Sequence, residues 1–266
     1  CRQALEREFG RVRAEHAAYS ANRRRERSMQ RMATQDNHLL SPTIVLRYRG
    51  GGTVAGRARL GMEFECDART DEQKNSMMRR TADAFVAAGL KHADGYMVAK
   101  RDGSVEGAYP IEFATVPCTV AEHVAVLNAA FPSGKFGDGA IRSWTNTTCG
   151  LHVHIGRRFM TPLTVGKMSV FWHHPDNDAA ITELAARAAN SYCRRSPVEL
   201  VDCINGRDGD RYRALNLSNV RTVEARVFRP SPNIFSIAKN LELVEASSRR
   251  SEEHTSELQS RFGISY

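Results

Sequence analysis

Two histidines separated by one residue, His152 and His154, alternate with aliphatic residues in the run LHVHI. Side chains at positions i and i+2 of an extended strand project from the same face. We therefore expect a strand with both imidazoles on one side. Such a pair can ligate a metal ion, but polar residues also line the solvent-facing side of many strands. The pair alone does not distinguish a site from a solvated surface.

Three other segments show the same alternation of apolar and ionisable residues. The segment GMEFEC carries Glu63 and Glu65, YPIEFATV carries Glu112, and TVEARVF carries Glu224 and Arg226. A sheet that gathers these strands on one face would collect four carboxylates, two imidazoles and one guanidinium. Burying so many carboxylates is costly unless a cation neutralises them. Hard divalent cations such as Mg²⁺ or Mn²⁺ suit oxygen-rich sites better than Zn²⁺ does.

Strands and helices alternate along the rest of the chain. The mixture of antiparallel strands with intervening helices predicts an α+β fold. Capping residues and apolar periodicity set the expected helix ends. The expected strands are 44–49, 57–66, 96–100, 109–116, 148–156, 211–219 and 221–229, and the expected helices are 70–88, 119–130, 162–173, 176–192 and 233–247.

The positive charge of the chain is confined to its N-terminal part. The formal net charge is +8, and residues 1–60 hold thirteen arginines, no lysine and five acidic residues. Residues 61–266 hold 25 basic and 25 acidic residues, so they have no electrostatic signature of nucleic-acid binding. We expect nucleic-acid contact, if any, only through the N-terminal arm.

The cysteines and the hydropathy pattern favour a cytoplasmic protein. The six cysteines show neither the CxxC spacing of metal sites nor the density of a secreted disulfide scaffold, so we expect reduced thiols. No run of about eighteen apolar residues is present, so we expect no membrane span. The sequence leaves the oligomeric state open.

Composition divides the chain into three parts. Residues 1–42 are interpreted as a basic helical arm and linker, and residues 43–249 as one catalytic domain that is truncated at its C-terminus. Residues 250–266, beginning RSEEHTSELQS, look like the translation of a sequencing-library adapter. We therefore exclude the last part from the fold prediction.

The motifs GMEFE, DGS followed by Glu112, CGLHVHIG, and RYRALNL followed by TVEARVF occur in this order along residues 60–247. Their combination resembles the amidoligases, a family of carboxylate-amine ligases related to glutamine synthetase and glutamate-cysteine ligase. The resemblance implies a glutamine-synthetase-like fold, a curved antiparallel sheet with flanking helices. It also implies an activity that uses ATP and Mg²⁺ or Mn²⁺ to join a carboxylate and an amine through an acyl phosphate. Amino acids, peptides and cell-wall fragments are the candidate substrates.

The resemblance also implies a role for each motif residue in metal binding. The paired acids of GMEFE look like ligands of two neighbouring ions, and the acid of DGS is similar to one that precedes the third carboxylate. The first histidine of HVH and the acid of TVEARVF look like the remaining ligands. The implied ligands are Glu63, Glu65, Asp102, Glu112, His152 and Glu224.

Basic residues complete the implied site. His154 looks like a residue close to the nucleotide phosphates, and Arg226 looks like a contact of phosphate or of a substrate carboxylate. Arg211, Arg213 and Arg221 are further candidates for phosphate contacts. Arg226 joins all of the metal ligands except Asp102 in the implied catalytic set.

Two other functions remain open from the sequence. A metal-dependent hydrolase could use the same histidines and glutamates to activate water, and it would turn over without ATP. A non-catalytic assembly or nucleic-acid-binding protein would depend on the basic arm instead, and substituting Glu224 would leave its binding unchanged.

Overall fold

The computed structural model describes residues 58–92, 95–157, 160–205 and 209–262, with side chains described as far as Ser251. All of these belong to one compact unit of the chain, residues 46–266. The expected basic arm, residues 1–42, and the expected strand 44–49 lie outside the described residues. Within the described part of the chain, no helix has both the length and the apolar character that crossing a membrane requires.

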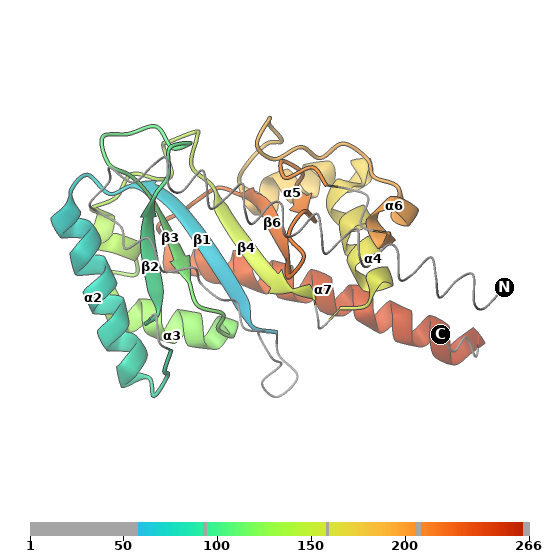
Figure 1. Ribbon diagram of the computed structural model, residues 1–266, viewed down its shortest axis with the longest axis horizontal. Helices are drawn as coiled ribbons and strands as arrows, with labels where there is room; N and C mark the ends of the chain where they lie inside the picture. Colours follow the sequence, from blue (N-terminus) through green and yellow to red (C-terminus); the bar gives the residue numbers. More distant parts are fainter. Residues whose placement is uncertain (1–57, 93–94, 158–159, 206–208, 263–266) are drawn as a thin grey trace, which may run out of the picture. The chain divides into compact units, whose positions relative to one another are not determined.

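The described unit is built around a six-stranded sheet in which every pair of neighbours is antiparallel. The strand order is β2-β3-β1-β4-β6-β5, so β1 and β4 lie at the centre (Figure 1). The antiparallel sheet with flanking helices agrees with the expected mixture of elements. The strands are β1 (Leu60–Asp67), β2 (Met97–Arg101), β3 (Pro110–Thr115), β4 (Leu151–Gly156), β5 (Leu215–Asn216) and β6 (Thr222–Phe228).

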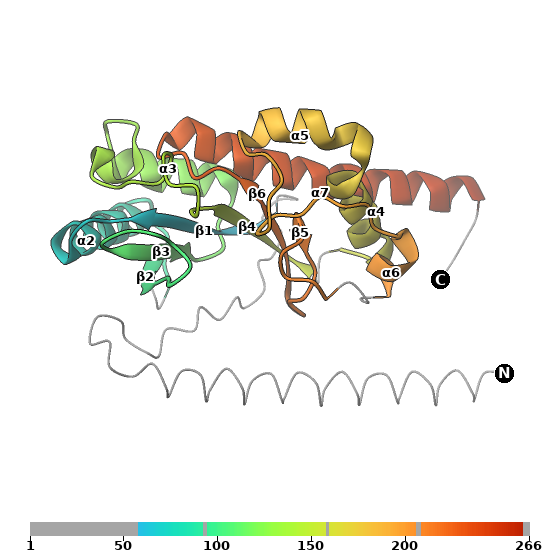
Figure 2. The ribbon, with the colours of Figure 1, turned by 90° about the horizontal axis from the view of Figure 1, so that it is seen from above.

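Helices and short loops connect these strands. Figures 1 and 2 show α3 and α7 on one side of the sheet, with α7 running along it behind the central strands. The helix α2 packs against α3 and β2, and α4 packs against α6 and α7. The helices are α2 (Asp71–Ala87), α3 (Val120–Ala130), α4 (Pro162–His173), α5 (Asp178–Ala185), α6 (Leu200–Ile204) and α7 (Ile234–Phe262).

Aromatic side chains fill the layer between the sheet and these helices. Phe136 follows α3 in the chain, and its ring packs edge-on against Phe64 of β1, Phe113 of β3 and Phe131 at the end of α3. All four rings are fully buried. Because side chains alternate along a strand, burying Phe64 on this side directs the flanking Glu63 and Glu65 to the opposite face.

Threonine caps begin three of the helices at positions close to those expected. The Thr119 hydroxyl accepts a hydrogen bond from the Glu122 amide, and Glu122 accepts one from the Thr119 amide, which completes a capping box. Thr70 and Thr161 accept equivalent bonds at the starts of α2 and α4. Each cap contributes about 1 kcal/mol to stability.

The structure corrects two expectations in the second half of the chain. The expected helix 176–192 is wrong beyond Ala185, because Ala186 takes a left-handed conformation with φ of 52° that ends α5. The expected strand 211–219 is also mostly wrong, because only Leu215–Asn216 joins the sheet. The residues before it instead exchange backbone hydrogen bonds with Arg194.

The C-terminal helix is longer than expected. The apolar pattern predicted a helix that ends near Ser247, whereas α7 continues to Phe262. It therefore runs through most of the segment that was excluded from the fold prediction. Ser248 and Ser251 are both buried, so the helix is still packed against the rest of the molecule beyond the expected end.

Candidate functional site

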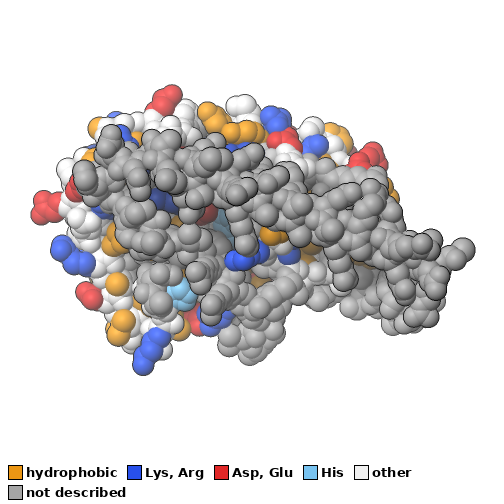
Figure 3. Space-filling model, viewed as in Figure 1, with side chains coloured by type: hydrophobic (Ala, Val, Ile, Leu, Met, Phe, Trp, Pro, Cys, Tyr) orange, Lys and Arg blue, Asp and Glu red, His pale blue; other side chains and the backbone are white. Residues whose placement is uncertain are grey.

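The polar face of the sheet gathers the ionisable residues of four strands. Glu63 of β1 lies opposite His152 of β4, and His154 of β4 lies opposite Glu224 of β6. On the other side of β1, Glu65 lies opposite Glu112 of β3. In the space-filling view, acidic, basic and histidine side chains are visible near the middle of the face that Figure 3 shows.

The first cluster is formed by Glu63, His152 and Glu224, each of which offers one ligand atom within 4.8 Å of the other two. His152 Nδ1 lies 3.6 Å from Glu63 Oε2 and 3.3 Å from Glu224 Oε1. The side chains of His152 and Glu224 are 5% and 7% exposed, so water contributes little to their solvation. We call these three residues the first triplet.

The second cluster is formed by Glu65, Asp102 and Glu112, whose ligand atoms also lie within 4.8 Å of one another. Asp102 comes from the turn between β2 and β3, where its Oδ1 accepts hydrogen bonds from the Ser104 amide and hydroxyl. Glu65 Oε2 accepts a hydrogen bond of 2.6 Å from the Gly150 amide. We call these residues the second triplet, and Glu65 links it to the first through His152 Nε2, 3.7 Å away.

A bulge in β6 brings Arg226 next to the first triplet. Leu151 pairs with Phe228 and Val153 pairs with Ala225, so two residues of β6 oppose the single residue His152 of β4. Arg226 donates to Glu224 Oε1, and its Nη1 lies 3.5 Å from His152 Nδ1. Its Nε donates to the Tyr192 carbonyl oxygen at 3.5 Å, which directs the guanidinium along the face.

The carboxylates have pKa values that move in opposite directions. Burial raises the pKa of Glu63, but the charge of His154 and hydrogen bonds from His152 and His154 outweigh it and hold the pKa well below its usual value. Burial also opposes ionisation of Glu224, and the charges of His154, His152 and Arg226 nevertheless lower its pKa. The two carboxylates of the first triplet are therefore ionised, and the neighbouring histidines and Arg226 stabilise their charge.

The second triplet is less well compensated. Burial raises the pKa of Glu65, although His152 partly offsets this. Burial and the negative charge of Glu63 raise the pKa of Glu112 to about 8, with Lys100 opposing the shift. Carboxylates held close together in a poorly solvated place repel one another, and a further positive charge would relieve that repulsion.

His154 lies between Glu63 of β1 and Thr222 of β6. Burial lowers its pKa, but the charge and hydrogen bond of Glu63 and the charge of Glu224 raise the net value to about 8. Its Nε2 lies 3.3 Å from Glu63 Oε2, and its Nδ1 lies 3.4 Å from the Thr222 hydroxyl. In the structure His154 therefore supports Glu63 from the side away from Glu65.

The structure brings together most of the site residues named from the sequence. Eight of them lie in the two triplets or contact them: Glu63, Glu65, Asp102, Glu112, His152, His154, Glu224 and Arg226. The remaining three arginines lie outside the two triplets. Arg211 lies over the ring of Tyr212, Arg213 donates to Ser196, and Arg221 is an exposed residue just before β6.

Three residues of the site were not identified from the sequence. Lys100 of β2 lies 2.5 Å from Glu112 Oε1 and 3.9 Å from Glu63 Oε1. The Asn216 amide donates to Glu224 Oε2 at 2.6 Å. Arg187 lies next to Gly150, where an added Cβ would be 2.8 Å from Arg187 Nη1. Alternation along MVAKR and the asparagine of RYRALNL were available signals for the first two.

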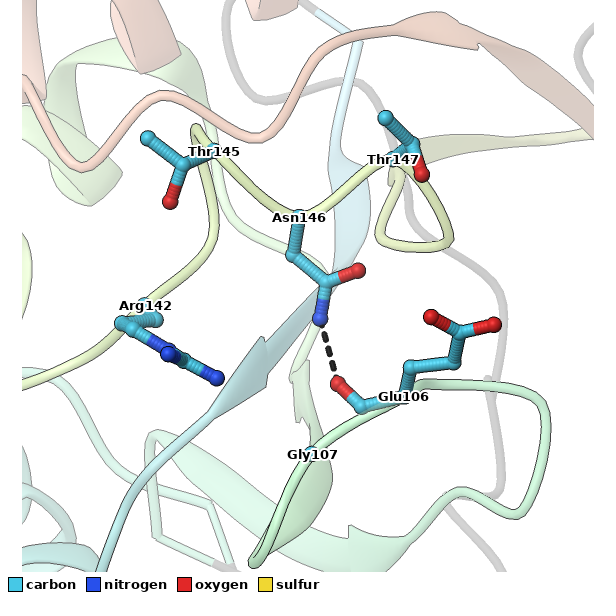
Figure 4. Close-up of a pocket in the computed structure, with 6 residues that line it drawn as sticks. All are labelled: Glu106, Gly107, Arg142, Thr145, Asn146 and Thr147. Carbon is cyan, nitrogen blue, oxygen red and sulfur yellow. Dashed lines mark hydrogen bonds between the residues drawn. The ribbon is translucent and has the colours of Figure 1, made fainter.

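A pocket of about 260 Å³ lies between the loop after β2 and the loop before β4. Arg142 and the carboxylate of Glu106 lie on opposite sides of Asn146, which donates to the Glu106 carbonyl oxygen (Figure 4). Arg142 also pairs with Asp67 at 3.3 Å. Asp67 follows Glu65 by two residues in β1, so the pocket adjoins the charged face.

The donor set of the two triplets fits hard divalent cations. Five of the six ligand residues are carboxylates and one is an imidazole, with no thiolate among them. Mg²⁺ and Mn²⁺ favour such oxygen-rich sets, whereas structural Zn²⁺ sites favour sulfur and nitrogen ligands. The five buried cysteines among the described residues are all free.

No protein-family model matches this chain, and no curated protein matches it. The functional assignment therefore depends on the site itself and on the motifs that resemble the amidoligases.

Proposed function

We propose that this protein is an ATP-dependent carboxylate-amine ligase of the amidoligase type, with a glutamine-synthetase-like fold and a requirement for Mg²⁺ or Mn²⁺. The observation that carries the proposal is the pair of adjacent triplets on one face of an antiparallel sheet. Neighbouring divalent ions are a common device for handling nucleotide phosphates. The order of the motifs along the chain supports the same assignment.

In the proposed reaction, the substrate carboxylate attacks the γ-phosphorus of ATP, which releases ADP and gives an acyl phosphate. An amine then attacks the acyl carbon, and phosphate leaves as the amide forms. Bound divalent ions would neutralise the phosphate charges during transfer. Glu63, His152 and Glu224 would hold one ion, and Glu65, Asp102 and Glu112 would hold the other.

The remaining residues of the face would bind and orient the reactants. Arg226 lies at the edge of the first triplet, and its planar guanidinium can donate two parallel hydrogen bonds to a phosphate or a carboxylate. His154 would hold Glu63 in position. The pocket lined by Arg142 and Asn146 would provide room for a substrate next to Glu65.

The decisive test is calorimetric titration of ATP into the purified protein with Mg²⁺ or Mn²⁺, and again with EDTA. We expect metal-dependent binding that is lost in Glu224→Gln, because an amide cannot replace an ionised ligand. The control is Glu242→Gln, which changes an exposed glutamate on α7. Equal binding of ATP by the parent and Glu224→Gln would reject the site.

A positive result leads to a test of the reaction. Candidate acids and amines would be screened for release of phosphate that requires ATP, the acid and the amine together. Metal-dependent turnover in the absence of ATP would instead support the hydrolase. An assembly or nucleic-acid-binding role would be supported if deletion of residues 1–40 abolished partner binding and Glu224→Gln left that binding unchanged.

A further inference from the structure

Lys100 contacts one carboxylate from each of the two triplets. Its Nζ lies 2.5 Å from Glu112 Oε1 in the second triplet and 3.9 Å from Glu63 Oε1 in the first. The contact follows from the register of the sheet, because Lys100 of β2 lies directly opposite Glu112 of β3. The ammonium group therefore lies between the two clusters of carboxylates.

We propose that Lys100 is a built-in counter-ion that competes with divalent cations for both triplets and must withdraw when they are loaded. This inference rests on the proposed cation sites, but it goes beyond them by naming a residue of the chain that sets their affinity.

A divalent ion bound to Glu63 or Glu112 would repel the ammonium group of Lys100, which contacts both carboxylates. Two like charges within about 4 Å repel strongly where solvent screening is weak, and the charge on the ion is double that of the ammonium. Glu112 is also a shared partner, because its side chain is only 11% exposed and its carboxylate, whose Oε1 contacts the ammonium group, is also a candidate ligand of a metal ion.

The position of Lys100 allows it to leave without disturbing the sheet. It lies on the edge strand β2, and its side chain is 49% exposed even while it contacts Glu112. Lysine has a flexible stem of four carbons that can carry its ammonium group into solvent. By contrast, the side chain of Arg226 is 13% exposed and is held by contacts with Glu224 and His152.

The test is the affinity of the intact chain for Mn²⁺ alone, measured by calorimetry for the parent, Lys100→Met and Lys100→Arg. We expect Lys100→Met to bind Mn²⁺ about tenfold more tightly or better, because the competing charge is gone while the apolar stem is retained. Lys100→Arg keeps the charge and should stay within a few-fold of the parent. Lys91→Met, which changes an exposed lysine after α2, should match the parent.

Thermal unfolding provides a second readout that does not depend on catalysis. Without metal, Lys100→Met should unfold at a lower temperature than the parent, because the contact between the ammonium group and Glu112 is lost. Added Mn²⁺ should then raise its unfolding temperature by more than it raises that of the parent.

The outcomes separate this inference from the proposed function. Mn²⁺ binding that is equal in the parent and Lys100→Met, and lost in Glu224→Gln, would overturn the role of Lys100 and leave the cation site in place. Absence of Mn²⁺ binding in both the parent and Lys100→Met would overturn both proposals. Binding of Mn²⁺ by Lys100→Met but not by the parent would show that Lys100 blocks the site completely in the metal-free protein.

Discussion

Glu63 and His152 lie directly opposite each other on the two central strands, with Glu63 Oε2 3.6 Å from His152 Nδ1. This pair connects the two triplets. Glu63 also contacts His154 and Lys100. His152 also contacts Glu65 and Glu224. A change that moves either side chain is therefore expected to affect both triplets.

Gly150→Ala should damage the site without changing any charged residue. An added Cβ would lie 2.7 Å from His152 Nε2, closer than Cβ atoms approach such atoms in proteins, and in a tight contact of 3.2 Å with Glu65 Oε2. We expect Mn²⁺ affinity to fall at least about tenfold and stability to fall by about 1–3 kcal/mol.

Calorimetry and urea unfolding would measure both effects of Gly150→Ala. Gly209→Ala is the matched control, because an added Cβ there meets no atom of the described residues within 4 Å. Unchanged Mn²⁺ affinity in Gly150→Ala would mean that the imidazole of His152 is not held in place as a ligand.

Asn216→Ala should weaken the first triplet through Glu224. The Asn216 amide donates to Glu224 Oε2 at 2.6 Å, and both side chains are buried. Removing the donor leaves a buried carboxylate oxygen without that bond, which costs about 1–3 kcal/mol. We expect a loss of stability of this size by urea unfolding, and addition of Mn²⁺ should recover part of it. A fully stable variant would show that Glu224 finds another partner.

Arg226→Lys should lower the affinity for ATP in the presence of Mg²⁺ by about tenfold or more, although the charge is kept. A lysine has a single charged nitrogen and cannot contact Glu224 and His152 while also donating to the Tyr192 carbonyl oxygen, as Arg226 does. Titration of ATP would measure the effect, with the exposed Arg79 changed to lysine as the control. Equal ATP affinity of the parent and Arg226→Lys would show that a positive charge at this position is sufficient and that the planar guanidinium is not required.

His123 should make the stability of the fold depend on pH. Its Nδ1 accepts a hydrogen bond from the Tyr96 hydroxyl, and its Nε2 donates to the Leu60 carbonyl oxygen, each at 2.8 Å. Burial lowers the pKa of His123 to about 4. The folded pKa is below the unfolded value, so the contribution to stability is complete above pH 6.5 or so and is lost as the pH falls toward 4.

The corresponding measurement is urea unfolding of the parent and His123→Gln at pH 7.5 and pH 5. Glutamine can keep both hydrogen bonds but does not titrate. Between these pH values we expect the parent to lose about 2 kcal/mol more stability than the variant. An equal loss in both proteins would show that His123 does not titrate on unfolding as expected.

The strands that carry the site could be predicted from the sequence because alternation is a local signal. The period of two in GMEFEC, LHVHI and TVEARVF placed their charged residues on one face, and the structure places them on one face of one sheet. Helices α2, α3 and α4 were also close to expectation, because threonine caps fix their starts.

Other parts of the site depend on contacts between distant segments. The strand order and the bulge opposite His152 arise from pairing across the sheet, for which the sequence has no local signal. Lys100 and Arg187 join the site only through that pairing and through the loop after α5. The end of α5 at Ala186 was missed because alanine rarely takes a left-handed conformation.

The strand order has a consequence for how the protein is made. The first triplet takes Glu63 from the first described strand and Glu224 from the last, with His152 between them. Contacts between residues so far apart in the chain form late and slowly. A chain emerging from the ribosome could not bind a metal ion at this triplet until β6 had been synthesised and paired with β4, so ion binding would report that folding of the sheet is finished.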